Sequence, residues 1–314
     1  MVPSQVVQAQ DDRGWRVLSQ VARTPGTPGT PEAPLVLRLP AGARVAAMAN
    51  VGGASTDADV VFYNPGMLQQ ARGVTVSVQR YGSQATTGSY ASVQSVGSFA
   101  VAVGAQLLDY RTTMPSDYVA AVRNGAPPLA DGGGVHASSS AFTIGVAGTM
   151  GGVRVGTAVK YVEDRIAAGR DGGAAFDVGV SRPLGFATLA VAVQNIGPGL
   201  TVANMPGRLP TRLTIGYGGG LFPLSASWDI GLQTQVAVER DGFVRPAGGV
   251  ELAYVPIEGV AVVVRQGLRL PRERDEPLVT GGLGVTVDRW SLDYAVEPMR
   301  GGRPVSHRLG LRIR

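Results

Sequence analysis

The chain offers few residues from which a reaction centre can be built. It has no cysteine and two histidines, His136 and His307, which excludes thiolate metal sites, disulfides and an all-histidine metal site. His136 lies in a glycine-rich segment, 132–137, just before three serines, 138–140. Serine hydrolysis needs a base that is held by a third group within reach of the nucleophile. Neighbours in a flexible loop do not provide this, so we predict no catalytic residue.

The other chemically suggestive patterns have simpler interpretations. The glycine clusters 132–134 and 218–220 lack both the strand-to-helix setting and the Lys-Ser/Thr pair of a phosphate loop, which indicates turns. One loop is acidic, and carboxylates are ligands that calcium accepts. Arg272 and Arg274 accompany these acids, which favours a solvated loop over a metal site. The acidic residues are Glu273, Asp275 and Glu276. The sequence predicts no metal, no cofactor and no enzyme.

Composition limits the class of protein. Of 314 residues, 45 are glycine, 44% are hydrophobic, 16% are charged and 6% are aromatic. So much glycine is unfavourable in helices, and so little charge is unlike a disordered polyelectrolyte. Lys160 is the only lysine, and the arginines are spread along the chain among acids, so there is no nucleic-acid footprint. Apolar runs such as Val260 to Val264 are too short for a transmembrane helix.

Residues 1–39 differ from the rest and are predicted to be a disordered N-terminal segment. Thr24 to Pro34 repeats Thr-Pro-Gly, which is typical of an extended linker. No secretory apolar stretch precedes it. Val7-Gln8-Ala9 before Gln10 nevertheless fits a small-residue cleavage pattern. Either the true start codon lies upstream and this is the remnant of a signal peptide, or the N-terminus is simply polar; the upstream reading frame distinguishes the two.

From residue 73 onward, apolar and small or polar residues alternate with a period of two, which indicates β-strands. In 99–107, for example, Phe, Val and Leu alternate with Ala, Gly and Gln. Some connections are tight, namely Gly151-Gly152, Val287-Asp288 and Gly301-Gly302, whereas 111–137 and 197–210 are long. Short turns at one end and long loops at the other are typical of outer-membrane barrels. Fourteen strands are predicted, with starts near 74, 88, 98, 138, 152, 173, 185, 211, 224, 243, 258, 277, 288 and 304.

The two faces of these strands favour a membrane barrel over a soluble sandwich. A sandwich leaves a strongly polar face in water, whereas here the less apolar face is rich in Gly and Ala. A barrel turns its apolar face to lipid and small or polar residues to the lumen. Isolated charges on that face are predicted to line the lumen: Arg154, Asp177, Arg212, Asp229, Glu251, Arg265 and Asp293. The sparse aromatics and the terminal Arg314 count against a barrel. A soluble or extracellular β-sandwich or adhesin-like structural protein is the alternative.

An ordered set of motifs resembles FadL-like outer-membrane barrels, and within them the PorV/PorQ branch. The opening motif comprises Gly42-Ala43-Arg44, Met48, Asp57, Asp59 and Tyr63-Asn64-Pro65-Gly66-Met67-Leu68. The branch is resembled by Val159-Lys160-Tyr161, Ala175-Phe176-Asp177-Val178-Gly179, Gln194-Asn195-Ile196-Gly197-Pro198, Leu209-Pro210, Leu213, Gly216, Glu251-Leu252-Ala253-Tyr254, Asp293-Tyr294-Ala295 and His307-Arg308-Leu309. Gly66 departs from the usual Ala, and Asn50 from the usual Gly.

The resemblance implies an all-β, transmembrane antiparallel barrel of about 14 strands over residues 73–314, with residues 40–72 folded inside the lumen as a hatch or plug. It places the protein in the outer membrane of a Gram-negative cell, in contact with outer-membrane lipid and with no nucleic acid. Two roles follow: passage of small hydrophobic compounds, or membrane partner of a secreted protein or of the secretion machinery. The residues predicted to contact a ligand or form the gate are Phe62, Tyr63, Asn64, Pro65 and Met67; the alternative is that they only plug the lumen. A barrel-type hydrolase is a third possibility, in which His136→Ala would abolish lipid hydrolysis.

Overall fold

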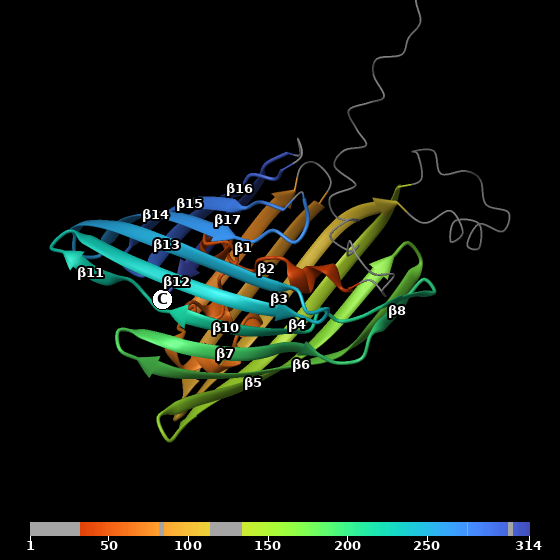
Figure 1. The fold of residues 1–314 in the computed structure, drawn as a ribbon, viewed down its shortest axis with the longest axis horizontal. Helices are drawn as coiled ribbons and strands as arrows, with labels where there is room; N and C mark the ends of the chain where they lie inside the picture. The colour runs from red at the N-terminus through yellow and green to blue at the C-terminus, as the bar shows by residue number, and fades with distance from the viewer. Residues whose placement is uncertain (1–31, 82–84, 114–133, 275, 301–303) are drawn as a thin grey trace, which may run out of the picture.

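The chain forms one closed antiparallel barrel. The structure is a computed structural model that describes residues 32–81, 85–113, 134–274, 276–300 and 304–314. Strand β1 pairs with β17, and β10 pairs with both β7 and β12, which closes the sheet (Figure 1). The fourteen barrel strands are β1 (Gly73–Tyr81), β2 (Ala85–Val96), β3 (Phe99–Thr113), β4 (Gly134–Met150), β5 (Val153–Ile166), β6 (Gly169–Leu184), β7 (Ala187–Ile196), β10 (Arg212–Gly218), β12 (Trp228–Glu239), β13 (Val244–Ile257), β14 (Val260–Arg269), β15 (Val279–Val287), β16 (Trp290–Glu297) and β17 (Ser306–Ile313).

The predicted fourteen-strand barrel is therefore confirmed. The structure adds a break that the sequence pattern did not predict. Strand β10 ends at Gly218, and its course resumes as β11 (Phe222–Ser225), which pairs with β12 alone. The strand predicted to start near 224 thus begins at Trp228, after this short piece.

The two ends of the barrel differ as predicted. At one end, six connections of two residues join β2–β3, β4–β5, β6–β7, β11–β12, β13–β14 and β15–β16. Gly151 and Gly152 have φ of 60° and 76°, as tight hairpins require. The turn predicted at Val287-Asp288 lies one residue later, at Asp288-Arg289, because Asp288 takes the left-handed conformation, with φ 50°. The turn predicted at Gly301-Gly302 lies outside the described residues.

The other end carries the long connections, together with shorter ones such as the two-residue turn 167–168 between β5 and β6. Residues 197–211 include the hairpin of β8 (Leu200–Val202) and β9 (Met205–Gly207), and 270–278 joins β14 to β15. In transmembrane barrels, short turns lie on the periplasmic side and longer loops on the outside. We call the two ends the short-turn end and the long-loop end.

The barrel wall is apolar outside and polar inside. On β17, outward Leu309 is 58% exposed, whereas inward Arg308 is 1% exposed. This is the reverse of a soluble protein and the arrangement of a barrel in lipid. On β4 the outward apolar side chains run from Phe142 to Met150, roughly 27 Å along the strand and about 20 Å along the barrel axis for a typical tilt.

The few aromatic residues are concentrated near the limits of this band. Rings of Trp228 and Tyr254 lie 5.1 Å apart, and Phe186 contacts both Tyr217 and Phe222. Exposed aromatics at the short-turn end are Phe99, Phe186, Phe222, Trp228, Tyr254 and Trp290. Although aromatic residues are few, they can form a rim at the membrane interface because they lie at the depth where such rims are found.

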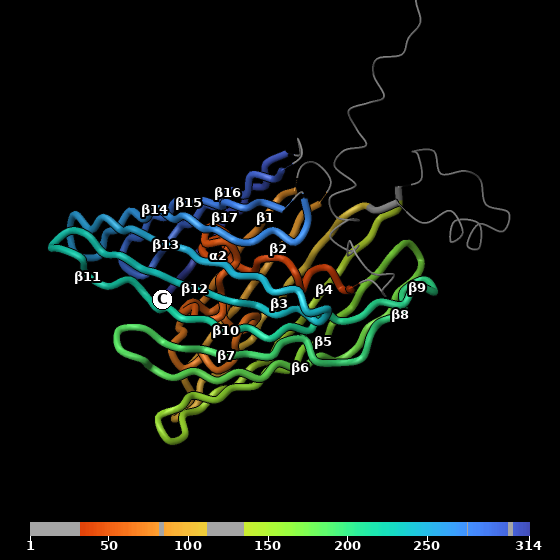
Figure 2. Tube along the Cα trace, viewed as in Figure 1, coloured from red at the N-terminus to blue at the C-terminus, as the bar shows by residue number. Residues whose placement is uncertain are grey.

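The lumen is filled by the chain preceding β1. Residues 41–72, the internal segment, comprise α2 (Ala43–Ala47), η2 (Ala58–Phe62) and η3 (Pro65–Gln70). Helix α2 contacts β14 to β17, whereas η2 and η3 contact strands among β1 to β7. Figures 1 and 2 show this red and orange segment enclosed by the strands. Within the described part of the chain, no helix is long and apolar enough to span a membrane.

The prediction that residues 1–39 are disordered is wrong for residues 32–39, the part of this segment that the structure describes. Residues 35–38 form η1 (Leu35–Arg38) at the long-loop end, where Ala33 N donates to Arg208 O at 2.9 Å. Leu35, Val36 and Leu37 are buried in an apolar cluster with β3, β4 and β5. This burial orders the stretch despite its proline-rich flank. Residues 1–31 lie outside the described residues.

Candidate functional site in the barrel lumen

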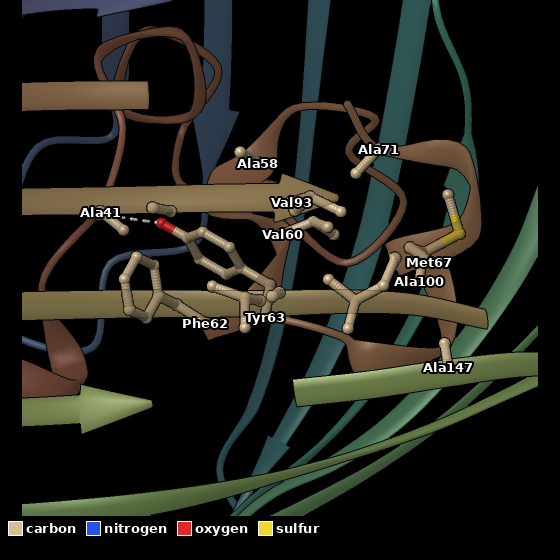
Figure 3. Close-up of a cluster of buried hydrophobic side chains, with 14 of the residues drawn as sticks. Ala41, Ala58, Val60, Phe62, Tyr63, Met67, Ala71, Val93, Ala100 and Ala147 are labelled. Atoms are coloured by element: carbon tan, nitrogen blue, oxygen red, sulfur yellow. Dashed lines mark hydrogen bonds between the residues drawn. The ribbon is translucent and has the colours of Figure 1, made fainter. Parts of the chain in front are cut away.

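One side of the internal segment packs against a wall of small residues. Phe62, Met67 and Leu68 are at most 4% exposed. They share an apolar cluster with the inward side chains Ala91, Val93, Ala100, Ala102, Ala147 and Ala190 (Figure 3). Alanine on the wall leaves room for the large side chains of the segment, so together they reach the close packing of a protein interior.

Glycines bring the backbone of η3 directly against the wall. A Cβ on Gly66 would stand 2.6 Å from the Gly179 carbonyl carbon, and a Cβ on Gly156 would stand 2.2 Å from Pro65 O. Ser181 Oγ, on the same wall, donates to Gly66 O at 2.7 Å. The departure of Gly66 from the alanine usual in FadL-like sequences is explained here, because a methyl group would collide with β6.

The residues predicted as ligand or gate contacts are buried anchors. Tyr63 Oη accepts from Ala41 N at 2.7 Å (the dashed line in Figure 3) and donates to Asn50 Oδ1 at 3.0 Å. Asn64 Oδ1 accepts from Gly66 N at 2.9 Å, which caps η3, and Asn64 Nδ2 donates to Gly53 O at 3.1 Å. These bonds fix the Asn-Pro-Gly turn from within the segment.

The wall also bonds to this turn. Gln194 Nε2, on β7, donates to the backbone oxygen of Phe62 at 2.6 Å. Pro65 and Met67 complete the predicted set and are buried. All five predicted residues therefore lie together between η2, η3 and the wall, and their contribution to gating stays a prediction.

The opposite side of the internal segment is held by a closed ring of alternating charges. Arg44 Nε donates to Glu251 Oε2 at 3.0 Å, and Arg44 Nη1 donates to Asp57 Oδ2 at 3.1 Å. Arg312 Nη1 donates to Asp57 Oδ1 at 2.9 Å. Two residues of the segment and four of the wall make up the ring, in the order Arg44, Glu251, Arg265, Asp293, Arg312 and Asp57.

The wall members of this ring are bonded as tightly as its segment members. Arg265 Nε donates to Glu251 Oε2 at 3.0 Å, and Arg265 Nη1 donates to Asp293 Oδ1 at 2.7 Å. All six side chains are at most 10% exposed. Three arginines balance three carboxylates within the ring, and half-exposed Arg314 adds a contact from outside it, because its Nη2 donates to Asp57 Oδ1 at 2.6 Å. Buried charges persist only when paired in this way.

The pKa values of two aspartates in the internal segment are shifted in opposite directions. Burial alone would raise the pKa of Asp57, but Arg312 and Arg44 hold it well below its ordinary value. Burial raises the pKa of Asp59 to about 7, and the negative charge of Asp57 adds to the effect. Asp59 is 2% exposed, and its Oδ1 has no hydrogen-bond partner among the described residues. Asp59 is thus the titratable group of the segment near neutral pH.

The other four residues predicted to line the lumen also face inward, but they lie outside the ring. Asp177 pairs with Lys160 Nζ at 2.7 Å. Arg212 Nε donates to Gln194 Oε1 at 2.7 Å. Arg154 lies beside Gln70 near the short-turn end, and Asp229 is half-buried on the inward face of β12. The structure thus unites Glu251, Arg265 and Asp293 in one site and leaves the other four outside it.

Three members of the ring, Arg44, Asp57 and Arg312, were not among the functional residues predicted from the sequence. Arg44 and Asp57 stand in the opening motif, which was the available signal, and Arg312 alternates with apolar neighbours on the last strand. Lys160, the partner of Asp177, likewise lies in a motif that resembles the PorV/PorQ branch, Val159-Lys160-Tyr161. Nothing in a single sequence shows which charges meet across the lumen.

Two small cavities lie at the long-loop mouth. One, of about 60 Å³, is lined by residues that include Arg38, Asn50, Tyr81, Arg269 and Met299. The other, of about 20 Å³, lies between η1 and the start of β10. Neither is lined by the five predicted gate residues. Both are smaller than the pockets that enclose drug-sized ligands.

The weaker candidates for chemistry fall outside the lumen. His136 is on β4, not in a loop, and its Nε2 is 2.7 Å from Asp109 Oδ2; both side chains are about two-thirds exposed. Glu276 bonds Arg245 and the backbone of Arg272, and Asp275 lies outside the described residues. Among described residues, no group of three or more His, Cys, Asp or Glu is arranged to hold a metal ion.

The fold and its filled lumen define an outer-membrane type of barrel. Comparison with solved structures agrees. The toluene transporter TodX of Pseudomonas putida matches with a TM-score of 0.58 and 11% identity over 87% of this chain and 97% of that chain. The monoaromatic hydrocarbon channel CymD matches with a TM-score of 0.55 and 10% identity over 90% of this chain and 97% of that one.

These structural neighbours are FadL-like hydrocarbon channels, and at such identities the likeness shows the fold. No protein-family model and no curated protein sequence matches the chain. Membership of the PorV/PorQ branch stays a prediction.

Proposed function

We propose that the protein lets small hydrophobic compounds cross the outer membrane, with the internal segment as its gate. The observation that carries the proposal is a lumen closed by a segment that is bound differently on its two sides. The likeness of the whole barrel to TodX and CymD supports it, since those proteins transport toluene or conduct monoaromatic hydrocarbons.

The free-energy cost of separating the internal segment from the barrel wall differs between its two sides. Removing one partner from a buried ion pair costs about 3–5 kcal/mol, so α2 and Asp57 stay fixed to β13–β17. On the other side, η3 meets its wall through apolar contacts, close glycine packing and a few hydrogen bonds. Solvating these few polar groups is less costly than separating buried charges. We infer that the gate opens between η3 and strands β4–β6.

Uptake of a hydrophobic dye tests the proposal. Purified protein is reconstituted into vesicles that contain lipopolysaccharide, and entry of N-phenyl-1-naphthylamine is followed by fluorescence. We expect faster entry than in protein-free vesicles. Equal rates would contradict the proposal.

A second role is favoured by the same filled lumen. A barrel whose lumen is occupied by its own chain also suits a membrane partner for a secreted protein or for the secretion machinery, as the PorV/PorQ resemblance implies. Vesicles that admit no dye, together with co-purification of a secreted protein, would support this role instead.

The location in the outer membrane is part of the proposal. The apolar outer face predicts that high salt does not extract the protein from membranes, and that the folded barrel migrates differently on a gel before and after boiling. Release by high salt alone would support the soluble or extracellular alternative.

A further inference from the structure

The outward face of β5 and β6 changes abruptly from apolar to charged near the long-loop end. On β5, Val159 and Tyr161 are each 49% exposed, and the next outward residues are Glu163 and Arg165. On β6, outward Phe176 is followed in the same direction by Ala174, Gly172 and Arg170. This change marks the limit of the lipid-facing band.

Two arginines meet at this limit in an unfavourable arrangement. Arg165 and Arg170 are direct partners in the antiparallel register of β5 and β6. Like charges directly opposite each other destabilise a sheet. Their side chains are 52% and 63% exposed, so lipid or solvent reaches both.

One carboxylate serves both arginines. Glu163 Oε1 accepts from Arg165 Nε, and Glu163 Oε2 lies 3.5 Å from Arg170 Nε. Tyr161 Oη also donates to Glu163 Oε2, at 3.3 Å. Among the outward residues of β5 and β6 at this end, two guanidinium groups and one carboxylate leave an excess positive charge. Exposed Arg111 lies on the same face of β3; the nearby pair of Asp109 and His136 contributes one carboxylate of its own.

The charges lie at the depth of lipid headgroups. Both arginines turn toward Glu163, which is one outward position beyond Tyr161, or roughly 7 Å along the strand. The headgroup layer beyond the hydrocarbon core is roughly 5–8 Å thick on each side. Directly opposite Glu163 and Tyr161, β6 presents the small residues Gly172 and Ala174, and the Tyr161 hydroxyl lies over Gly172, 2.7 Å from the position of a Cβ there.

We propose that Arg165 and Arg170 bind a phosphate-bearing lipid headgroup of the leaflet at the long-loop end, with its acyl chains lying beside Tyr161. A phosphate suits the site because guanidinium groups bind it bidentately and are always charged. It would also relieve the repulsion between the opposed arginines. The site is separate from the lumen, so it does not depend on the proposed transport function.

Native mass spectrometry of the full chain in detergent tests this site, with diphosphorylated lipid A as the probe. We expect Arg165→Gln/Arg170→Gln to lower the bound fraction about tenfold or more, since each charge-assisted contact is worth more than 1.4 kcal/mol. Arg182→Gln is the matched control, because Arg182 is exposed on the outward face of β6 near the short-turn end.

Two further variants separate binding from folding. Arg165→Lys/Arg170→Lys keeps the charge and should retain much of the binding. Glu163→Gln removes the competing carboxylate and should strengthen it. Each variant is first shown to be a folded barrel by its heat-dependent gel mobility. Equal lipid binding by wild type, the double Gln variant and the Arg182 control would overturn the proposal.

Discussion

At the scale of single residues, the lumen is organised by charge on one side and by small size on the other. The ring of three arginines and three carboxylates joins residues that are as far apart in sequence as Arg44 and Glu251, or Asp57 and Arg312. Each member has two partners within the ring, so the loss of any one leaves its neighbours underpaired.

Removal of one ring arginine should be costly. In Arg265→Met, Glu251 and Asp293 each lose a partner while staying buried, so the free energy of unfolding should fall by roughly 3–5 kcal/mol. Chemical denaturation in detergent, followed by gel mobility, measures this. Arg182→Met, at an exposed site, should change it by no more than about 0.5 kcal/mol. Equal stability of the two variants would show that the ring contributes nothing.

Asp59 should make stability depend on pH. The pKa of its carboxyl is raised to about 7, so the folded state holds this proton between the ordinary value near 4 and 7, while the unfolded state releases it. The stability contributed by this proton is present below about pH 4 and is lost as pH rises through 7.

The matching variant is Asp59→Asn, which stays neutral at every pH. Thermal unfolding at several pH values between 4 and 8 should show a fall in Tm with rising pH for wild type that is reduced in the variant. The same slope in both proteins would rule out Asp59 as the source.

At the scale of elements, the strands of the barrel could largely be predicted from the sequence, whereas the contacts inside the lumen could not. Alternation of apolar and small residues predicted the strands because each wall residue faces either lipid or lumen. The break between β10 and β11 was missed because the cluster 218–220 was interpreted as an ordinary turn. The ring was missed because its partners are fixed by register between distant strands, which one sequence does not reveal.

The contact between η3 and β6 should not tolerate a methyl group. In Gly66→Ala the new Cβ would meet the β6 backbone at 2.6 Å, so η3 must shift, at a cost of about 1–3 kcal/mol in the free energy of unfolding. Gly220→Ala is the control, because a Cβ there has nothing within 4 Å. A Gly66→Ala protein as stable as the control would contradict the tight packing described for η3.

At the scale of the whole molecule, the composition follows from the architecture. Apolar residues cover the outside, and glycine and alanine make room inside for a segment of 32 residues, 41–72. The low charge reflects a surface that meets lipid. The cavities lined by the described residues named above are about 60 Å³ or smaller, which is why the proposed passage of a ligand is assigned to a movement of this segment.

Because the chain has no cysteine, paired cysteines can lock either side of the segment. Leu68 Cδ1 lies 3.0 Å from the position of a Cβ on Gly145, so the side chain at position 68 points at β4. Ala43 Cβ lies 2.8 Å from the position of a Cβ on Gly310, closer than the roughly 3.5–4.5 Å between the Cβ atoms of a disulfide, so a small shift of α2 is needed there. The pair Leu68→Cys/Gly145→Cys ties the apolar side to β4. The pair Ala43→Cys/Gly310→Cys ties α2 to β17, beside the ion ring.

The most direct test compares dye entry into vesicles that contain these two proteins, oxidised and then reduced. If the gate lies between η3 and strands β4–β6, oxidation stops entry through Leu68→Cys/Gly145→Cys, a reductant restores it, and Ala43→Cys/Gly310→Cys conducts in both states. Entry unaffected by the lock on η3, or blocked only by the lock on α2, would contradict a gate between η3 and strands β4–β6.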